Sequence, residues 1–155
     1  VVTEVGLMQP AAIIDSPASG TTSGPVPFED RVSAARWLEM NAATDDIIAT
    51  TDESSAFVPA YTGLRMFLAG SRYQVGLGNA SDIAEIERRS AITAELREGS
   101  PEAMDQALAA LCAASVRWLW WEGSIPTRFT DFVARSEGAV NVIDLAPMCE
   151  SSDAT

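Results

Sequence analysis

The chain has 155 residues, of which 47% are hydrophobic, and its ten basic and 22 acidic residues give a net charge of −12. This length suits one domain with one substantial core, and the apolar fraction excludes a disordered chain. A surface this acidic repels phosphate backbones, so nucleic acid is not an expected partner.

Histidine and lysine are both missing from the chain, and every basic residue is an arginine. Without histidine the chain cannot build a Ser-His-Asp or Cys-His nucleophile or a His-ligated zinc site, and without lysine it has no P-loop or Schiff-base lysine. No apolar run approaches the roughly 20 residues that span a bilayer. We therefore expect a soluble domain whose remaining chemistry would use carboxylate, hydroxyl, Arg, Tyr or thiol groups. We assign it no catalytic residue, no metal and no cofactor.

The first 27 residues differ from the rest of the chain. Residues 1–27 are rich in Pro, Gly, Ser and Thr, which predicts a linker that does not pack. The more apolar stretch 1–14 could instead form an edge segment against the domain. The chain opens at Val1 without an initiator Met or a signal peptide, so we expect it to be part of a longer protein.

From residue 28 onward, helical and strand patterns alternate. Phe28, Val32, Ala35 and Leu38 recur at the spacing of one helix face. Predicted helices cover 28–40, 81–99, 100–111 and a segment around 129–133. A short helical turn is predicted around 57–63. Predicted strands cover 46–51, 64–69, 116–121 and 140–145, and the polar tail 148–155 is expected to fray.

This element order predicts the fold class. Connections long enough to hold a helix favour right-handed crossovers between parallel strands. The prediction is a single α/β domain over 28–147, three-layer and Rossmann-like, with a mostly parallel sheet of four to five strands and helices on both faces.

Open parallel sheets bind ligands beyond the carboxyl ends of their strands. Polar side chains follow the predicted strands there, and the alternative is that they are ordinary loop residues that cap strand ends. The ligand-binding candidates are Asp52, Glu53, Ser55, Arg72, Tyr73, Gln74 and Glu122, with Ser54 and Ser124 beside them.

Three tryptophans lie close together on the predicted strand 116–121. Trp118, Trp120 and Trp121 could form a sugar-stacking platform or a membrane-interface belt. Trp118 and Trp120 share one strand face and Trp121 takes the other. In a central strand both faces are covered by helices, so core packing is the favoured interpretation.

Two further patterns have simpler explanations than a site. The pairs Asp45-Asp46 and Asp52-Glu53 could serve glycoside hydrolysis or bind magnesium, but neighbours on a strand point to opposite faces, so solvated charge is favoured. The run GLGNAS at 76–81 lacks the third glycine of a dinucleotide fingerprint, and a glycine-rich helix entry is favoured.

Cys112 and Cys149 are the only cysteines. If the last strand is parallel to its neighbours, the two residues lie at opposite edges of the sheet, and a bridge would need Cys149 to fold back or the last strand to run antiparallel. On the predicted parallel sheet we expect two unpaired cysteines.

Several segments together carry a resemblance to a known family. These are the helix RVSAARWLEMN at 31–41, the strand DDIIAT at 45–50, the turn and strand AFVPAYTGLRMFLAG at 56–70, and CAASVRWLW at 112–120. Over about 28–122 the chain resembles the C-terminal extracytoplasmic domain of large bacterial multi-pass membrane proteins. The membrane part of those proteins is similar to type C glycosyltransferases, which use polyprenyl-linked sugar donors.

The resemblance implies a function that the residues alone do not. It implies a non-catalytic domain on the extracytoplasmic face of a bacterial membrane, bound to the membrane portion of the same polypeptide and positioning an envelope glycan or a partner protein. The parent protein would be the glycosyltransferase, and no catalytic residue carries over to this chain. The alternative is a small-molecule-binding or hydrolytic α/β domain that uses the strand ends; a nucleotide-binding domain is disfavoured by the absent lysine.

Overall fold

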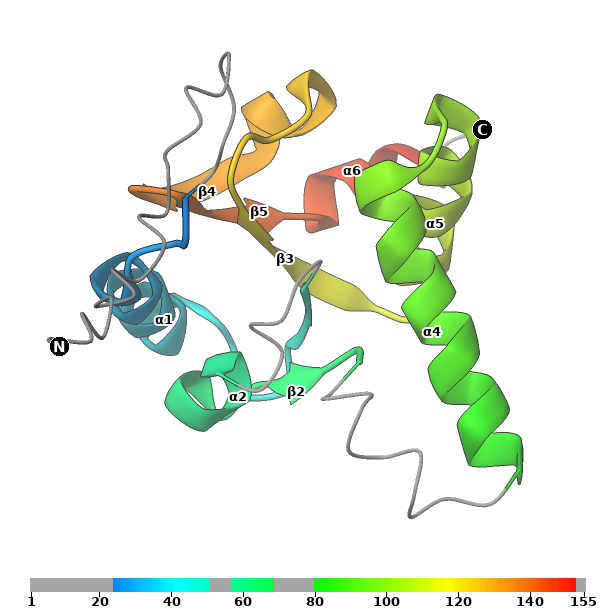
Figure 1. Cartoon of the computed structure of the whole chain (residues 1–155), viewed down its shortest axis with the longest axis horizontal. Helices are drawn as coiled ribbons and strands as arrows, with labels where there is room; N and C mark the ends of the chain where they lie inside the picture. The colour runs from blue at the N-terminus through cyan, green and yellow to red at the C-terminus, as the bar shows by residue number, and fades with distance from the viewer. Residues whose placement is uncertain (1–23, 51–56, 69–79, 153–155) are drawn as a thin grey trace, which may run out of the picture.

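A five-stranded mixed sheet organises the fold (Figure 1). The computed structural model describes residues 24–50, 57–68 and 80–152. The strands are β1 (Ile47–Thr50), β2 (Arg65–Met66), β3 (Val116–Glu122), β4 (Val133–Glu137) and β5 (Val140–Asp144). The helices are α1 (Phe28–Asn41), α2 (Phe57–Thr62), α4 (Ala80–Glu98), α5 (Pro101–Ala113), the 3-10 helix η2 (Thr127–Phe132) and α6 (Ala146–Ser152).

The sheet has the order β2-β1-β3-β5-β4 and two kinds of pairing. β1 is parallel to both β2 and β3, whereas β5 is antiparallel to both β3 and β4. The expected α/β class is confirmed, and the expectation of a mostly parallel sheet holds for the first three strands only. It is wrong for β5 and β4.

A tight hairpin causes the antiparallel part. β4 and β5 are separated by Gly138 and Ala139 alone, and Gly138 has a φ of 55°. A two-residue connection can join only antiparallel neighbours, and glycine adopts positive φ without strain. The helix predicted around 129–133 is instead the 3-10 helix η2 followed by β4.

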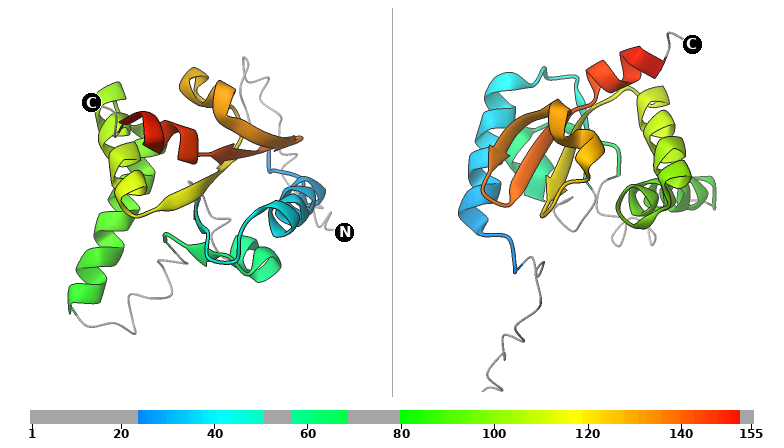
Figure 2. Two further views of the ribbon diagram at one scale, coloured as in Figure 1. Left: turned by 180° about the vertical axis from the view of Figure 1, so that it is seen from behind. Right: turned by 90° about the horizontal axis from the view of Figure 1, so that it is seen from above.

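Helices cover both faces of the sheet (Figure 2). Alternate residues of β3 divide between two cores, because successive strand side chains point to opposite faces. Trp118 and Trp120 pack with α1 and α2 through Ala35, Leu38 and Val58. On the other face the second core has contributions from α4, α5, η2 and β5, through residues that include Leu96, Leu111, Phe129 and Ile143.

Local signals at several helix ends act as predicted. The Ser100 hydroxyl accepts a hydrogen bond from the Ala103 amide at 3.2 Å, and Pro101 is the first residue of α5. Gly99 follows α4, and its amide donates to the Glu95 carbonyl at 2.9 Å. Gly63 follows α2 with a φ of 68°.

The C-terminal segment differs from the prediction of a frayed tail from Met148. Residues 146–152 form α6, whose first amide, from Ala146, donates to the Asp144 carboxylate at 3.0 Å. Met148 and Cys149 pack against the core on the α5 side. The expected fraying is therefore wrong up to Ser152.

Candidate functional site

The carboxyl ends of β1 and β3 form the edge where the sequence places a ligand site. Most of the candidates lie outside the described residues, namely Asp52, Glu53, Ser55, Arg72, Tyr73 and Gln74, and so does the glycine-rich run from 76 to 79. Glu122, the last residue of β3, lies within them, at the predicted edge.

Glu122 is a buried carboxylate whose two oxygens both accept hydrogen bonds. Its side chain is 7% exposed. Arg31 donates to both oxygens, from Nε and Nη2, each at 2.8 Å. The indole Nε1 of Trp120 donates to the same carboxylate at 3.0 Å. This bidentate, charge-assisted pair compensates for the desolvation of the carboxylate and fixes its orientation.

The start of α1 lies at this edge because two of its side chains reach across to the sheet. Besides Arg31, the carboxylate of Asp30 accepts a hydrogen bond from the Ala139 amide in the β4–β5 turn at 3.0 Å. From the opposite face Arg97 of α4 donates to the Glu122 carbonyl at 3.3 Å, and its guanidinium lies 5.6 Å from the Trp121 ring centroid. Sequence analysis missed these contacts, since Arg31 and Glu122 are 91 residues apart.

Three aromatic rings meet beside this ion pair, and we call Phe28, Phe57 and Tyr61 the aromatic cluster. The Phe57 and Tyr61 rings are stacked with centroids 4.3 Å apart. The Phe28 ring meets Phe57 edge-on at 5.6 Å and Tyr61 edge-on at 6.4 Å. Phe28 is 60% exposed and Tyr61 is 45% exposed, so the cluster faces solvent. The spacing of Phe28 with Val32, Ala35 and Leu38 predicts a ring that packs on the domain, and that prediction is wrong.

The three tryptophans of β3 belong to the core. Trp118, Trp120 and Trp121 are 4%, 0% and 3% exposed. Each indole N–H has an acceptor: the Asp46 carboxylate, the Glu122 carboxylate and the Ser124 carbonyl respectively. The interpretation as core packing rather than a sugar platform is confirmed.

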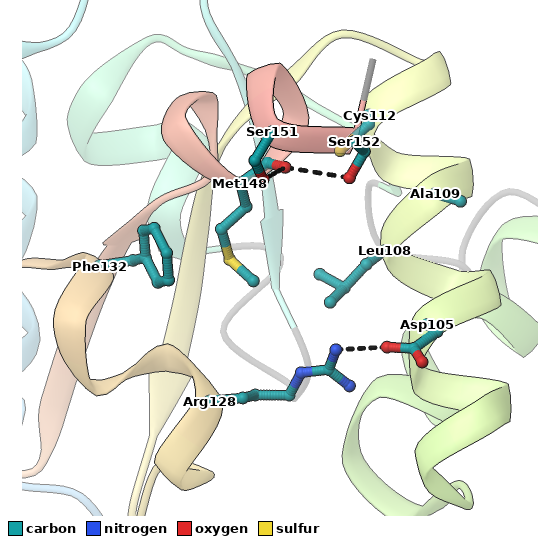
Figure 3. Close-up of a pocket in the computed structure, with 9 residues that line it drawn as sticks. All are labelled: Asp105, Leu108, Ala109, Cys112, Arg128, Phe132, Met148, Ser151 and Ser152. Carbon is teal, nitrogen blue, oxygen red and sulfur yellow. Dashed lines mark hydrogen bonds and ion pairs between the residues drawn. The ribbon is translucent and has the colours of Figure 1, made fainter. Parts of the chain in front are cut away.

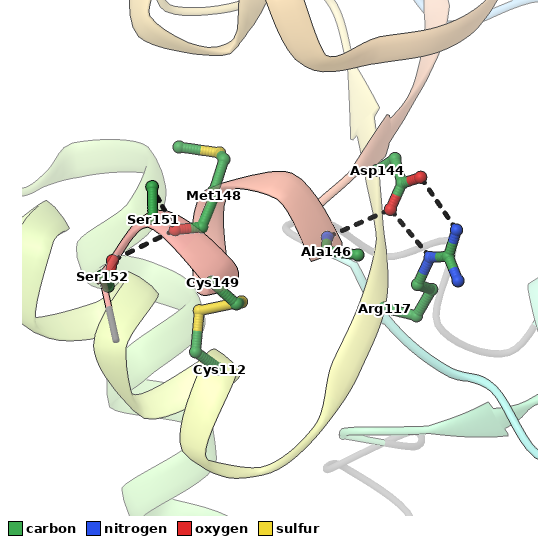
Figure 4. Close-up of a disulfide and its surroundings, with 8 residues drawn as sticks. All are labelled: Cys112, Arg117, Asp144, Ala146, Met148, Cys149, Ser151 and Ser152. Atoms are coloured by element: carbon green, nitrogen blue, oxygen red, sulfur yellow. Dashed lines mark hydrogen bonds and ion pairs between the residues drawn. A yellow bond between two sulfur atoms is a disulfide. The ribbon is translucent and has the colours of Figure 1, made fainter. Parts of the chain in front are cut away.

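Cys112 and Cys149 form a disulfide between the end of α5 and α6 (Figure 4). The expectation of two unpaired cysteines is wrong, because β5 runs antiparallel to β3 and returns the chain to the edge where α5 ends. On the same edge Arg117 forms a bidentate pair with Asp144 at 2.8 and 3.0 Å. Hydrogen bonding to Asp144 raises the pKa of Arg117.

A cavity of about 300 Å³ lies between α5, η2 and α6 (Figure 3). Leu108, Phe132 and Met148 supply apolar walls, and Asp105 and Arg128 form an ion pair at one side. The Ser151 and Ser152 hydroxyls both donate to the Met148 carbonyl. The volume is at the lower limit for a small-molecule pocket, and its polar groups already bind one another.

In 24–50, 57–68 and 80–152 no group of three or more acidic or cysteine side chains is placed to hold a metal ion. Over the same ranges no helix is long and apolar enough to cross a membrane.

Comparisons with known proteins add no family. No family model matches the chain, and neither the curated proteins nor the solved structures contain a match. Function has to be argued from the residues of this chain.

Proposed function

We propose that this chain is a non-catalytic, extracytoplasmic domain of a multi-pass membrane protein of the bacterial cell envelope, where it binds or positions a glycan or a partner protein. The disulfide between Cys112 and Cys149 is the observation that carries the proposal. Disulfides persist in oxidising compartments and are rare in the cytosol, where thiols are kept reduced.

The position of the bridge favours a structural disulfide over a catalytic one. Both cysteines are half-buried and lie at the edge of the sheet opposite Glu122. The bridge closes a loop of chain with a sequence separation of 37, which includes all of β3, β4 and β5. A cross-link of that span stabilises mainly by restricting the unfolded chain.

The order of the described elements supports the family part of the proposal. A helix ending at Asn41, a strand, a short helix ending before Gly63 and a second strand follow one another as the resemblance implies. The net charge of −12 also suits the outer face of a bacterial membrane, since basic residues concentrate on the cytoplasmic side.

A finer architectural inference concerns the parallel strands. β2, β1 and β3 are adjacent, and α2, which precedes β2, packs on the opposite face of the sheet from α4 and α5, which follow it. We infer that this part is a reduced Rossmann-like unit to which the β4–β5 hairpin has been added. Such units bind ligands at the carboxyl ends of the strands, which supports a site near Glu122.

The redox state of the cysteines inside the producing cell tests the proposal. Cells are quenched in acid, free thiols are blocked with N-ethylmaleimide, and the chain is analysed by mass spectrometry. We expect the Cys112–Cys149 bridge in nearly all molecules and the doubly alkylated peptide only after reduction. Two free thiols in freshly quenched cells would remove the argument for an extracytoplasmic location.

The small-molecule alternative depends on the strand-end residues outside the described ranges. Its test is ligand binding by Asp52→Ala and Arg72→Ala variants, for which Arg65→Ala is a control because Arg65 is exposed and donates to the Asp45 carbonyl at the amino end of β1. Unaltered binding in the first two variants would end this alternative.

A further inference from the structure

Exposed aromatic rings are concentrated at one place on the described surface. Burying a ring of this size contributes about 1.5–3 kcal/mol, so a phenylalanine left 60% exposed forgoes much of that gain. The large exposed hydrophobic side chains of the described ranges are Phe28, Met40 and Tyr61. Phe28 and Tyr61 are in ring contact, whereas Met40 lies 12 residues along α1, about 18 Å away.

The aromatic cluster is held in place from behind. Phe57 stacks on Tyr61 and meets the ring of Trp120, which is fully buried, at a centroid distance of 6.4 Å. Val58 anchors α2 in the core, and Leu38 does the same for α1. A ligand would therefore meet rings that are already ordered, which lowers the entropic cost of binding.

Polar groups border the rings on one side. Arg31 is one helical turn after Phe28, and residues three apart on a helix are surface neighbours. Its side chain is 32% exposed and is oriented by the buried carboxylate of Glu122. The Tyr61 hydroxyl adds a polar edge to an apolar ring. Apolar faces with polar groups at their margin match a sugar ring, which has a C–H face and a hydroxyl periphery.

Charge and size select among the ligands that bind aromatic surfaces. The net charge of −12 and the exposed Glu29 beside Phe28 disfavour anionic polymers and anionic lipid surfaces. A stable protein interface takes about 20–30 residues on each side, far more than this cluster supplies. A neutral sugar needs only one or two rings.

We infer that Phe28, Phe57 and Tyr61 form the surface on which this domain stacks a neutral sugar residue of a glycan. The inference rests on the proposed function and gives its ligand a chemical class and a place: the carboxyl-end edge beside Arg31 and Glu122. Exposed patches of apolar side chains on folded domains commonly mark such contact sites.

Titration of the full chain with neutral oligosaccharides tests this inference. The probes are cello-, malto-, manno-, xylo- and chitohexaose, with binding followed by calorimetry and by NMR of the aromatic ring protons. We expect at least one probe to bind and to shift the Phe28 and Tyr61 ring signals. Phe28→Ala and Tyr61→Ala should each raise its Kd about tenfold, whereas Phe28→Trp should retain binding.

Met40→Ala is the matched control, since it removes another exposed apolar side chain of α1 outside the cluster. Its Kd should stay within about twofold of the parent chain. All variants alter exposed side chains, and circular dichroism checks that they fold.

The outcomes separate this inference from the proposed function. If none of the five probes binds, or if Phe28→Ala and Tyr61→Ala bind as the parent chain does, the sugar surface is wrong, while a bridge found in cells would still support the extracytoplasmic location. Sugar binding that depends on Phe28 and Tyr61, together with free thiols in cells, would retain the surface and overturn the location.

Discussion

The two sides of β3 are stabilised in different ways. On the β1 side, parallel strands are covered by α2 and α4, and buried side chains hold the layers together. On the β5 side, α1 packs against β5, in which Val140, Val142 and Ile143 are buried. The edge strand β4 has no fully buried residue, and α6 is joined to α5 by a disulfide. Because the edge strand β4 contributes little apolar burial, the disulfide supplies part of the stabilisation on this side.

Removing the disulfide should have the largest effect. The chain-entropy relation gives about 4 kcal/mol for a loop of this length, so the double variant Cys112→Ser, Cys149→Ser should lower the free energy of unfolding by about 2–4 kcal/mol. Thermal denaturation should show a fall in Tm on the order of 10 °C.

Dithiothreitol provides the control for that variant, because the chain has only these two cysteines. The reductant should lower the Tm of the parent chain to that of the double variant and leave the variant unchanged. Equal Tm values for the oxidised parent and the double variant would show that the hairpin side does not depend on the bridge.

Breaking the Arg31–Glu122 pair, which joins α1 to the end of β3, should have the next largest effect. Glu122→Ala leaves the Arg31 guanidinium and the Trp120 N–H without this carboxylate. Because Glu122 is 7% exposed but Arg31 is 32% exposed, we expect a loss of about 2–3 kcal/mol in urea denaturation.

The pair Arg135–Glu137 on β4 is the matched control, since its side chains are 49% and 24% exposed. Glu137→Ala should cost at most about 1 kcal/mol. Similar losses for Glu122→Ala and Glu137→Ala would contradict the view that burial makes the first pair the stronger one.

The same division explains which parts of the fold were predictable. Ser100 and Pro101 carry a local helix-start signal, and the alternation of Trp118 and Trp120 with Trp121 follows from strand geometry. β4 has no such signal, because three of its five residues are exposed and no periodicity marks a buried face.

The candidate site was only partly predictable for a related reason. Glu122 was found because it ends a strong strand pattern. Its partner Arg31 is 91 residues away, and only the folded chain brings the two together. Phe28 has the spacing of a core residue, so its sequence position predicts a buried ring, whereas the ring is exposed.

Substitution of Gly63 and of Gly138 compares one turn on each side of β3, and both should lower the free energy of unfolding by less than loss of the disulfide or of the Glu122 carboxylate. Both Gly63 and Gly138 have positive φ, but a Cβ at Gly63 meets open space, whereas at Gly138 it would lie on the carboxylate of Asp30. Gly63→Ala should cost about 1 kcal/mol from backbone strain alone, and Gly138→Ala about 2 kcal/mol because it also displaces the acceptor of the Ala139 amide.

Urea denaturation of both glycine variants measures that difference. In Gly138→Ala the amide exchange of Ala139 should also accelerate, and in Gly63→Ala it should not. Equal losses would mean that Asp30 moves aside without cost and that α1 does not depend on the hairpin turn.

The smallest expected effect is a loss of stability at low pH on the side of the parallel strands, where α4 contacts the end of β2. Hydrogen bonds from Arg88, then from Arg89, lower the pKa of Glu85 from 4.5 to about 2, and Arg89 also donates to the Phe67 carbonyl after β2 at 2.6 Å. A depressed carboxyl pKa contributes stability above the unfolded value near 4.5, and that contribution is lost as the pH falls toward about 2.

Carboxyl NMR of Glu85 measures this response directly. The titration midpoint should lie near pH 2 in the parent chain and move toward 4.5 in the double variant Arg88→Ala, Arg89→Ala. Because the disulfide does not titrate in this range, the contact between α4 and the end of β2 should loosen in acid before the contact between α5 and α6. Amide exchange at pH 2 that rises equally in both places would show that the two sides of β3 unfold as one unit.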